Sequence, residues 1–383
     1  MLYWDNAATT YPKPPAVTAA VVTAFSKYGA NPGRGGHALA YATSEMLYRC
    51  RETAARFFGL AVPDNVVFTL NCTAALNMVI KGILRDGGRA VISDVEHNAV
   101  LRPLFNVAGR RLDIAKVSFT NPDETVENIR RLIRTDTKLI VCTHASNVWG
   151  VTLPIREMGA LAREYGIPFA VDAAQTAGVL PIDMEKDNID FLCVAGHKGL
   201  YGPMGTGMLL TSGRYPLPSF TEGGTGSRSL DPVQPAEWPD HMESGTPNTA
   251  GICGLKAGME WVAAQGMAAI ERHELSLIQT VYRCLENLPA AHLYTPFPLQ
   301  GKTVPVLSFN FDGSPSEQTA ALLNEAGVAV RAGLHCAPLA HRKMGIEKQG
   351  TVRLSPSVLT DARECVNICK ILQQTAQKTL HTT

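Results

Sequence analysis

The hydrophobic positions in the first part of the chain alternate between two patterns. Apolar side chains recur at helical spacing over residues 43–58, 125–134 and 155–165. Between such segments lie short apolar runs bounded by turn or polar residues, which predict strands at 66–70, 90–93, 139–143, 169–171, 191–194 and 208–211. Strands that alternate with helices in this way are typical of a mostly parallel sheet with helices on both faces.

The pattern changes after Gly251. Helical spacing extends over 254–287, and a proline-rich segment follows at 289–305. Further along, the pattern predicts a strand, a helix and a strand at 304–311, 317–326 and 328–331, then a strand at 352–354 and a closing helix at 361–377. We therefore expect an α/β protein with an N-terminal segment (1–15), a large domain (16–253) and a smaller C-terminal α/β domain (254–383), the two domains being joined by the long helix.

Composition narrows the functional classes. The 383 residues carry a formal net charge of +1, so no overall field favours nucleic acid or an anionic membrane, and we expect neither as a partner. No apolar run approaches the length of a membrane span, and the first residues show no secretory signal. The cysteines number nine, an odd count, and they are scattered through apolar stretches, which favours reduced thiols in a cytoplasmic protein.

Cys365 and Cys369 lie one helical turn apart, which is a spacing that could place two thiols on one metal ion. No second pair of ligands lies near them in the sequence. We interpret both as core residues of the closing helix and expect no metal site.

Chemically reactive side chains follow five of the predicted strands. They lie at residues 71–74, 96–98, 144–147, 172–175 and 196–198. Ligands of open α/β sheets bind outside the carboxyl ends of the strands, so these segments should meet along one rim. Packing alone does not account for this convergence, and the rim is therefore the predicted binding site.

Lys198, Asp172 and Thr73 have the chemistry of a pyridoxal-phosphate (PLP) site. Lys198 lies among small residues that permit close approach of a ligand, and a desolvated setting would lower the pKa of a Schiff-base lysine. Asp172 ends an apolar strand, where a carboxylate either pairs with a protonated ring nitrogen or serves as a cap or structural ion pair. Thr73 opens a helix directly after a strand, where amide groups bind phosphate, although a plain N-cap gives the same pattern.

Three further side chains extend the predicted site. His97 on the rim is a ring-stacking or proton-transfer residue, with a helix cap as the alternative. Cys336 lies beside basic side chains in a loop bounded by glycine and proline, which is the setting of an exposed nucleophile rather than of a buried thiol. Arg353, on a short strand, is either a surface ion-pair partner or a clamp for a substrate carboxylate. The glycine-rich run 199–207 lacks the Gly-Lys-Ser/Thr start of a P-loop, which excludes that class of ATPase.

Taken together, the motifs resemble the class V aminotransferase family of fold-type I PLP enzymes, over the chain from Asp5 to the closing helix. The loop around Cys336 is similar to that of group II (SUF-type) cysteine desulfurases, a branch that includes selenocysteine lyase-like members. The motifs that carry the resemblance are Glu96-His97-Asn98, Ser146-Asn147-Val148-Trp149-Gly150, Val171-Asp172-Ala173-Ala174-Gln175, Gly196-His197-Lys198, Ser244-Gly245-Thr246-Pro247-Asn248 and residues 331–338.

The resemblance implies a fold-type I transferase fold and a role for each cofactor residue. Lys198 would bind PLP covalently and shuttle a proton, while His97 would stack on the pyridine ring. Asp172 would pair with the ring nitrogen, and Gln175 would contact the ring hydroxyl. The phosphate would be held by Thr73, the Ala74 amide, His197 and, across a homodimer, Thr246 of the partner subunit. Ala195 stands where these enzymes usually carry a serine, so one hydrogen bond to the phosphate would be missing or replaced.

The resemblance also implies the reaction. Asn147 and Arg353 would hold the substrate carboxylate, and Cys336 would attack the sulfur of L-cysteine to leave L-alanine and an enzyme persulfide. The sulfur would pass to an acceptor protein for iron–sulfur cluster or thio-cofactor assembly. Selenocysteine lyase, cysteine sulfinate desulfinase and class V aminotransferase are alternatives within the same fold. A PLP-free sulfurtransferase or a non-catalytic scaffold would leave Lys198 and Asp172 unexplained.

Overall fold

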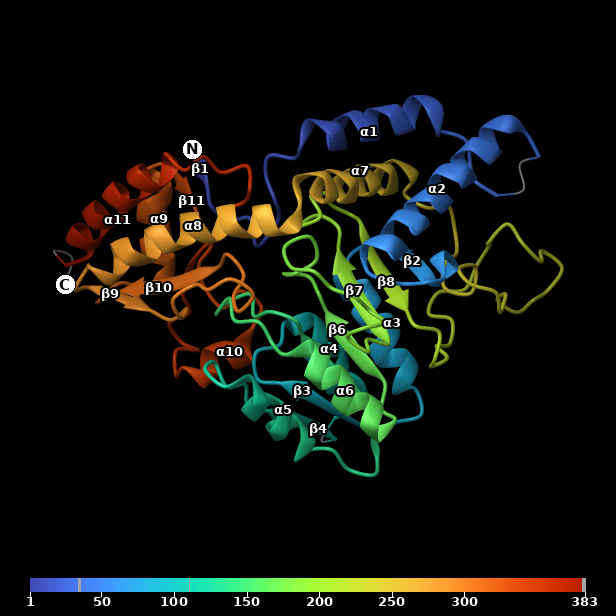
Figure 1. Ribbon diagram of the computed structural model, residues 1–383, viewed down its shortest axis with the longest axis horizontal. Helices are drawn as coiled ribbons and strands as arrows, with labels where there is room; N and C mark the ends of the chain where they lie inside the picture. The colour runs from blue at the N-terminus through green and yellow to red at the C-terminus, as the bar shows by residue number, and fades with distance from the viewer. Residues whose placement is uncertain (34–35, 110, 381–383) are drawn as a thin grey trace.

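A seven-stranded sheet forms the centre of the larger half of the molecule in the computed structural model, which describes residues 1–33, 36–109 and 111–380 (Figure 1). Five neighbouring strands run parallel, and the strand β8 is antiparallel to both of its neighbours. The order across the sheet is β2 (Val66–Thr69), β8 (Gly207–Thr211), β7 (Phe191–Ala195), β6 (Phe169–Asp172), β5 (Thr137–Thr143), β3 (Arg89–Ser93) and β4 (Leu112–Ala115). The predicted, mostly parallel sheet is confirmed.

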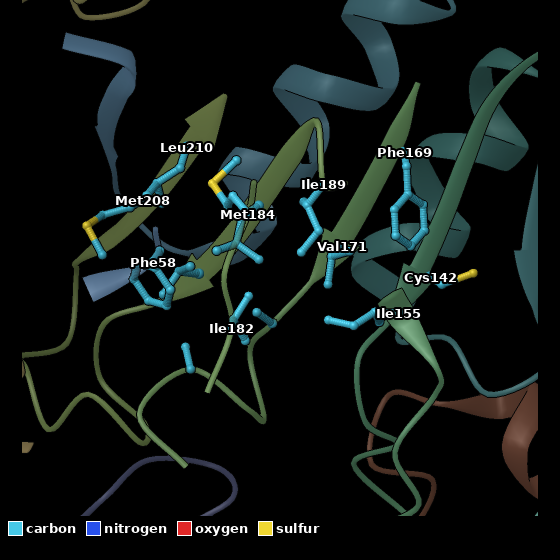
Figure 2. Packing of buried hydrophobic residues seen from close by; sticks show 14 of the residues in the cluster. Phe58, Cys142, Ile155, Phe169, Val171, Ile182, Met184, Ile189, Met208 and Leu210 are labelled. Carbon is cyan, nitrogen blue, oxygen red and sulfur yellow. The ribbon is translucent and has the colours of Figure 1, made fainter. Parts of the chain in front are cut away.

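The apolar runs are continuous because the central strands are buried on both faces. Successive residues of β6 enter different cores: Phe169 and Val171 pack on one face, and Ala170 packs on the other. Figure 2 shows Phe169 and Val171 on the same face as Ile155, at the start of helix α6 (Ile155–Tyr165). The sheet is therefore the middle layer of three.

Helices α1 to α5 precede α6 along the chain, and their ends show where the predicted bounds differ from the structure. They are α1 (Pro15–Lys27), α2 (Ala38–Phe57), α3 (Cys72–Ile83), α4 (Asn98–Val107) and α5 (Pro122–Arg130). Helix α5 begins three residues before the predicted start at 125, because the side chain of Asn121 caps its first turn and Pro122 fits there without needing an amide donor. Helix α2 likewise starts earlier than predicted, at a cap provided by His37.

The predicted single helix over 254–287 is wrong. The structure has two helices, α7 (Thr249–Gln265) and α8 (Met267–Glu286), separated at Gly266. Gly266 has a φ of +81°, a backbone conformation that ends α7 and that side chains with a Cβ rarely adopt. Helix α8 alone extends away from α7 into the smaller half of the molecule (Figure 1).

The smaller half is built on a three-stranded antiparallel sheet with β10 (Leu307–Phe311) between β12 (Val352–Leu354) and β9 (Ala291–Leu293). Its core also contains side chains from α8, α9 (Ser316–Glu325) and α11 (Glu364–Leu380). The first residues of the chain join this half: β1 (Leu2–Tyr3) pairs with β11 (Val328–Ala329), and Trp4 is buried in the same core. Within the described ranges, no helix has the length and hydrophobicity needed to cross a membrane.

Glu274 of α8 is a buried carboxyl group where the two halves meet. Its side chain is 3% exposed, and its Oε1 accepts a hydrogen bond from the Tyr201 hydroxyl at 3.4 Å. The Tyr201 hydroxyl in turn accepts a bond from the Val358 amide at 3.2 Å. Oε2 has no hydrogen-bond partner within the described residues. Burial raises the pKa of Glu274 to about 8, so the folded protein holds a proton there at neutral pH.

We expect Glu274→Gln to flatten the pH dependence of stability. Between pH 4.5 and 8 the unfolded chain releases this proton and the folded chain retains it, so stability falls as pH rises, by at most about 1.4 kcal/mol per pH unit. Glutamine cannot ionise and removes this slope. Urea unfolding from pH 5 to 8 measures it, with Glu325→Gln at an exposed position as the control. An unchanged slope in Glu274→Gln would show that the carboxyl group ionises freely in the folded state.

Candidate active site

A cavity of about 290 Å³ lies at the carboxyl ends of the central strands. Most of the residues predicted from the sequence line it: Thr73, His97, Asn147, Asp172, Gln175, His197 and Lys198. The convergence on one rim that the strand ends predicted is therefore present. Ala74, Thr246, Cys336 and Arg353 do not line this cavity.

Asp172 ends β6 and is 3% exposed. Its Oδ1 accepts hydrogen bonds from the Ala174 amide at 2.9 Å and from the Cys72 thiol at 3.3 Å. In the part of the chain that the structure describes, nothing donates to Oδ2. Asp172 lines the cavity, so this oxygen is available to a ligand there, and a protonated ring nitrogen would supply the donor.

Lys198 and His97 face the same cavity. Burial lowers the pKa of Lys198, the positive charges of Arg353 and Arg331 act in the same direction, and Asp172 opposes them. The amine is therefore more often neutral, and more nucleophilic, than a surface lysine. His97 is both a cap and a cavity residue: its Nδ1 accepts a hydrogen bond from the Ala99 amide at 3.0 Å, which fixes the ring plane.

Glu96 holds the backbone around His97 in place, a role that local sequence does not reveal. Its carboxyl oxygens accept two hydrogen bonds from the Thr143 amide, at 2.9 and 3.0 Å, and one from the Ser93 hydroxyl. Glu96 therefore links the ends of β3 and β5 beside the cavity. The side chain is fully buried, and burial raises the pKa of Glu96 to about 8.

The expected phosphate end of the site is only partly free to bind an anion. Asn71 caps α3, and its Oδ1 accepts a hydrogen bond from the Ala74 amide at 2.9 Å, so the amide expected to bind phosphate already has a partner. The buried Nδ1 of His197 has no partner among the described residues, and burial lowers the pKa of His197 to about 4. A neutral histidine with one unpartnered nitrogen fits a phosphate oxygen as a hydrogen-bond donor.

Lys13 was not anticipated from the sequence. Its amine donates to the carbonyl oxygen of His197 at 2.7 Å and to the Thr10 hydroxyl at 2.7 Å. Burial lowers the pKa of Lys13 to about 8. The contacts tie the N-terminal segment to the backbone that precedes Lys198, and only the folded chain brings residue 13 close to residue 197.

Arg353 is buried in a network that joins distant parts of the chain. Its side chain is 1% exposed, so the alternative of a surface ion pair is wrong. One terminal nitrogen donates to Asp5 Oδ1 at 2.9 Å, and the other donates to the Asn147 carbonyl oxygen at 3.1 Å. Nε has no partner within the described chain. Asp5 anchors the guanidinium, and the unpartnered Nε–H suits a carboxylate ligand.

Cys336 is exposed, in a loop whose backbone is fixed to the larger half. The Cys336 carbonyl oxygen accepts from the Asn98 amide at 2.7 Å, and the His335 carbonyl oxygen accepts from Asn147 Nδ2 at 2.7 Å. Both loop residues have positive φ, 48° at His335 and 57° at Cys336. Strained backbone of this kind persists only where surrounding contacts hold it.

His335 is not a cation beside the thiol, contrary to the expectation from the sequence. Burial lowers the pKa of His335 to about 2, and the ring Nε2 hydrogen bonds to the Thr351 carbonyl oxygen at 2.9 Å. Its place is structural, beneath the loop. The buried Arg353 guanidinium, and not His335, is a cation that interacts electrostatically with Cys336.

Comparison with known proteins identifies the family and confirms the fold. Residues 2–366 match the model of the family described as Aminotransferase class-V. The chain belongs to this family. A probable cysteine desulfurase of Methanothermobacter thermautotrophicus is 32% identical over 98% of this chain and 94% of its own length. The apo structure of cysteine desulfurase from Thermococcus onnurineus superposes with a TM-score of 0.89 at 30% identity, covering 98% of this chain and 95% of that one. The structure of the Escherichia coli cysteine desulfurase CsdA, in an S-sulfonic acid form, gives 0.85 at 28% identity, covering 98% and 94%.

In this member of the class-V aminotransferase family, Thr246 does not line the cavity that Lys198 faces. It lines a separate hollow of about 380 Å³ together with Ala74, Gly205 and Phe220. Gln175 does line the main cavity, and its Nε2 donates to the Ala7 carbonyl oxygen at 3.1 Å. The prediction that Thr246 acts on the cofactor of a partner subunit is compatible with this placement and stays a prediction.

We expect Asp5→Asn to destabilise the protein by about 3 kcal/mol, because it leaves the Arg353 guanidinium buried without its counter-charge. Urea unfolding at neutral pH measures the loss. The matched control is Asp361→Asn, which removes an exposed partner of Arg363 and should change stability little. Equal effects of the two substitutions would show that Arg353 does not depend on Asp5.

Proposed function

We propose that this chain is a PLP-dependent L-cysteine desulfurase that produces L-alanine and an enzyme persulfide on Cys336. The observation that carries the proposal is the arrangement of Lys198 and Asp172 in one cavity with an exposed thiol on a loop docked beside it. Family membership and the nearly full-length similarity to proteins named cysteine desulfurase support it.

The residues present fit PLP. Lys198 supplies the amine for covalent attachment, Asp172 Oδ2 the counter-charge for the ring nitrogen, and His97 the ring that stacks on the pyridine. Gln175 would contact the ring hydroxyl, and Thr73 and His197, which line the same cavity, would bind the phosphate. When bound, PLP supplies an electron sink for the negative charge that develops on the substrate.

Arg353 and Asn147 hold the carboxylate of L-cysteine in this proposal. Asn147 has two amide hydrogens on Nδ2, one of which is used by the His335 carbonyl oxygen. The same residue can therefore orient the substrate and fix the loop that carries the nucleophile. The Lys198 amine takes a proton from one carbon atom of the substrate and returns a proton to another.

Sulfur transfer then needs only the thiol of Cys336. The thiolate attacks the substrate sulfur, an S–S bond forms, and the C–S bond breaks with its electron pair left on the substrate carbon. That carbon takes a proton, so L-cysteine and the enzyme thiol become L-alanine and an enzyme persulfide. Arg353 lies close enough to interact with Cys336 electrostatically.

The wider setting is also part of the proposal. The exposure of Cys336 allows an acceptor protein to take the persulfide sulfur, for iron–sulfur cluster or thio-cofactor assembly. The placement of Thr246 outside its own cavity favours a homodimer in which it completes the phosphate site of the other subunit. The nine free cysteines favour a reducing compartment such as the cytoplasm.

Lys198→Ala should abolish covalent attachment of PLP. Wild-type protein loaded with PLP and reduced with borohydride should carry the label on Lys198, as peptide mapping would detect. Lys13→Ala is the matched control, because burial also lowers the pKa of Lys13. In this variant the PLP label should still be found on Lys198. A label retained in Lys198→Ala would place the attachment site elsewhere.

Cys336→Ala should keep the visible absorbance of bound PLP but yield little L-alanine or sulfide from L-cysteine. Selenium leaves carbon more easily than sulfur, so any breakdown of L-selenocysteine should survive far better in this variant. Cys284→Ala, at another incompletely buried cysteine, is the control and should keep full activity. Wild-type rates in Cys336→Ala would remove the desulfurase proposal and favour an aminotransferase or lyase that needs no thiol.

A further inference from the structure

We propose that Cys72 is a positioning residue for the cofactor: its thiol donates to Asp172 Oδ1, which turns Oδ2 toward the ring nitrogen and sets how strongly the carboxylate attracts the ring proton. The effect on the ring proton rests on the proposed PLP function. The hydrogen bond from Cys72 to Asp172 does not. The chemistry involved is a neutral S–H donor acting on a buried carboxylate.

The geometry leaves one oxygen of Asp172 free. Oδ1 receives two donors, the Cys72 thiol at 3.3 Å and the Ala174 amide at 2.9 Å. Two donors satisfy the two lone-pair directions of that oxygen. No residue in the described ranges donates to Oδ2. One carboxylate oxygen is therefore hydrogen-bonded within the protein, and the other is available to a ligand. Cys72 itself lines the cavity that Lys198 faces.

Cys72 is held in this position by secondary structure. It is the first residue of α3, directly after the capping residue Asn71, and it is buried against the strands on which Asp172 and Cys193 lie. Burial and the neighbouring Asp172 charge raise the pKa of Cys72 well above that of an ordinary thiol. Cys72 therefore keeps its proton and remains a donor at neutral pH.

The chain offers a matched comparison in Cys193. This residue pairs with Asp172 across β6 and β7, is fully buried, and feels the same carboxylate electrostatically. Its thiol makes no hydrogen bond to Asp172 among the described contacts. An effect that depends on burial of a thiol near Asp172 should appear at both cysteines, whereas an effect of the hydrogen bond should appear only at Cys72.

A donor to a carboxylate stabilises the anion and lowers its affinity for a proton. A thiol is a weaker donor than a hydroxyl group, and a methyl group donates nothing. Asp172 should therefore attract the ring proton least with serine at position 72, more with the native cysteine and most with alanine. A purely structural role for Cys72 would not produce effects of opposite sign.

The first measurement uses the protein without PLP. The Raman S–H stretching band of Cys72 is obtained by subtracting the spectrum of Cys72→Ser from that of the wild type. Its frequency should be lower than that of a free thiol. The frequency should rise in Asp172→Asn, because the acceptor there is neutral. The band of Cys193, isolated in the same way with Cys193→Ala, should not move as far. A Cys72 band that does not respond to Asp172→Asn overturns the hydrogen bond, whatever the cofactor.

The second measurement uses holoenzyme loaded with PLP labelled with ¹⁵N in the ring. Cys72→Ser should shift the ring ¹⁵N resonance toward that of a free pyridinium ion, and Cys72→Ala should shift it in the opposite direction. Cys193→Ala should leave it in place. Shifts of the same sign in both Cys72 variants, or an equal shift in Cys193→Ala, overturn the tuning role. Failure of wild-type protein to take up PLP would instead count against the proposed function, while the Raman result still decides the hydrogen bond.

Discussion

The site depends on the burial of one guanidinium group. Arg353 comes from the C-terminal sheet, its counter-charge Asp5 from the first residues of the chain, and its second partner, the Asn147 carbonyl, from the loop after β5. A buried charge is destabilising when it loses its partners, so the meeting of these three segments stabilises the fold. The pairing of β1 with β11 and the burial of Trp4 serve the same end, because they hold Asp5 in the C-terminal half.

The sequence predicted the larger half and the rim well, because both follow from local patterns. Continuous apolar runs identified strands buried on two faces. Asp172 stood out because a carboxylate at the end of such a run needs a partner, and Lys198 because small residues surround it after a strand. The break at Gly266 was missed, since apolar spacing continues through it and only the backbone angle separates the two helices.

The features that were missed depend on contacts between residues distant in the chain. No local pattern brings Asp5 to Arg353, Lys13 to the His197 carbonyl, or Cys72 to Asp172. His335 is one of the basic side chains that lie beside Cys336 in the sequence, but burial beneath the loop keeps it neutral, and the sequence does not show that burial. The family resemblance implied phosphate binding by the Ala74 amide, but Asn71 already accepts a hydrogen bond from that amide.

The two carbonyl contacts of the Cys336 loop limit how far the sulfur can travel. The His335 and Cys336 carbonyl oxygens accept hydrogen bonds from Asn147 and Asn98, so any large displacement of this loop has to break both. In the proposed reaction, the sulfur would therefore be handed over close to the position at which Cys336 receives it. The approach to the exposed thiol would then be made by the acceptor and not by the loop.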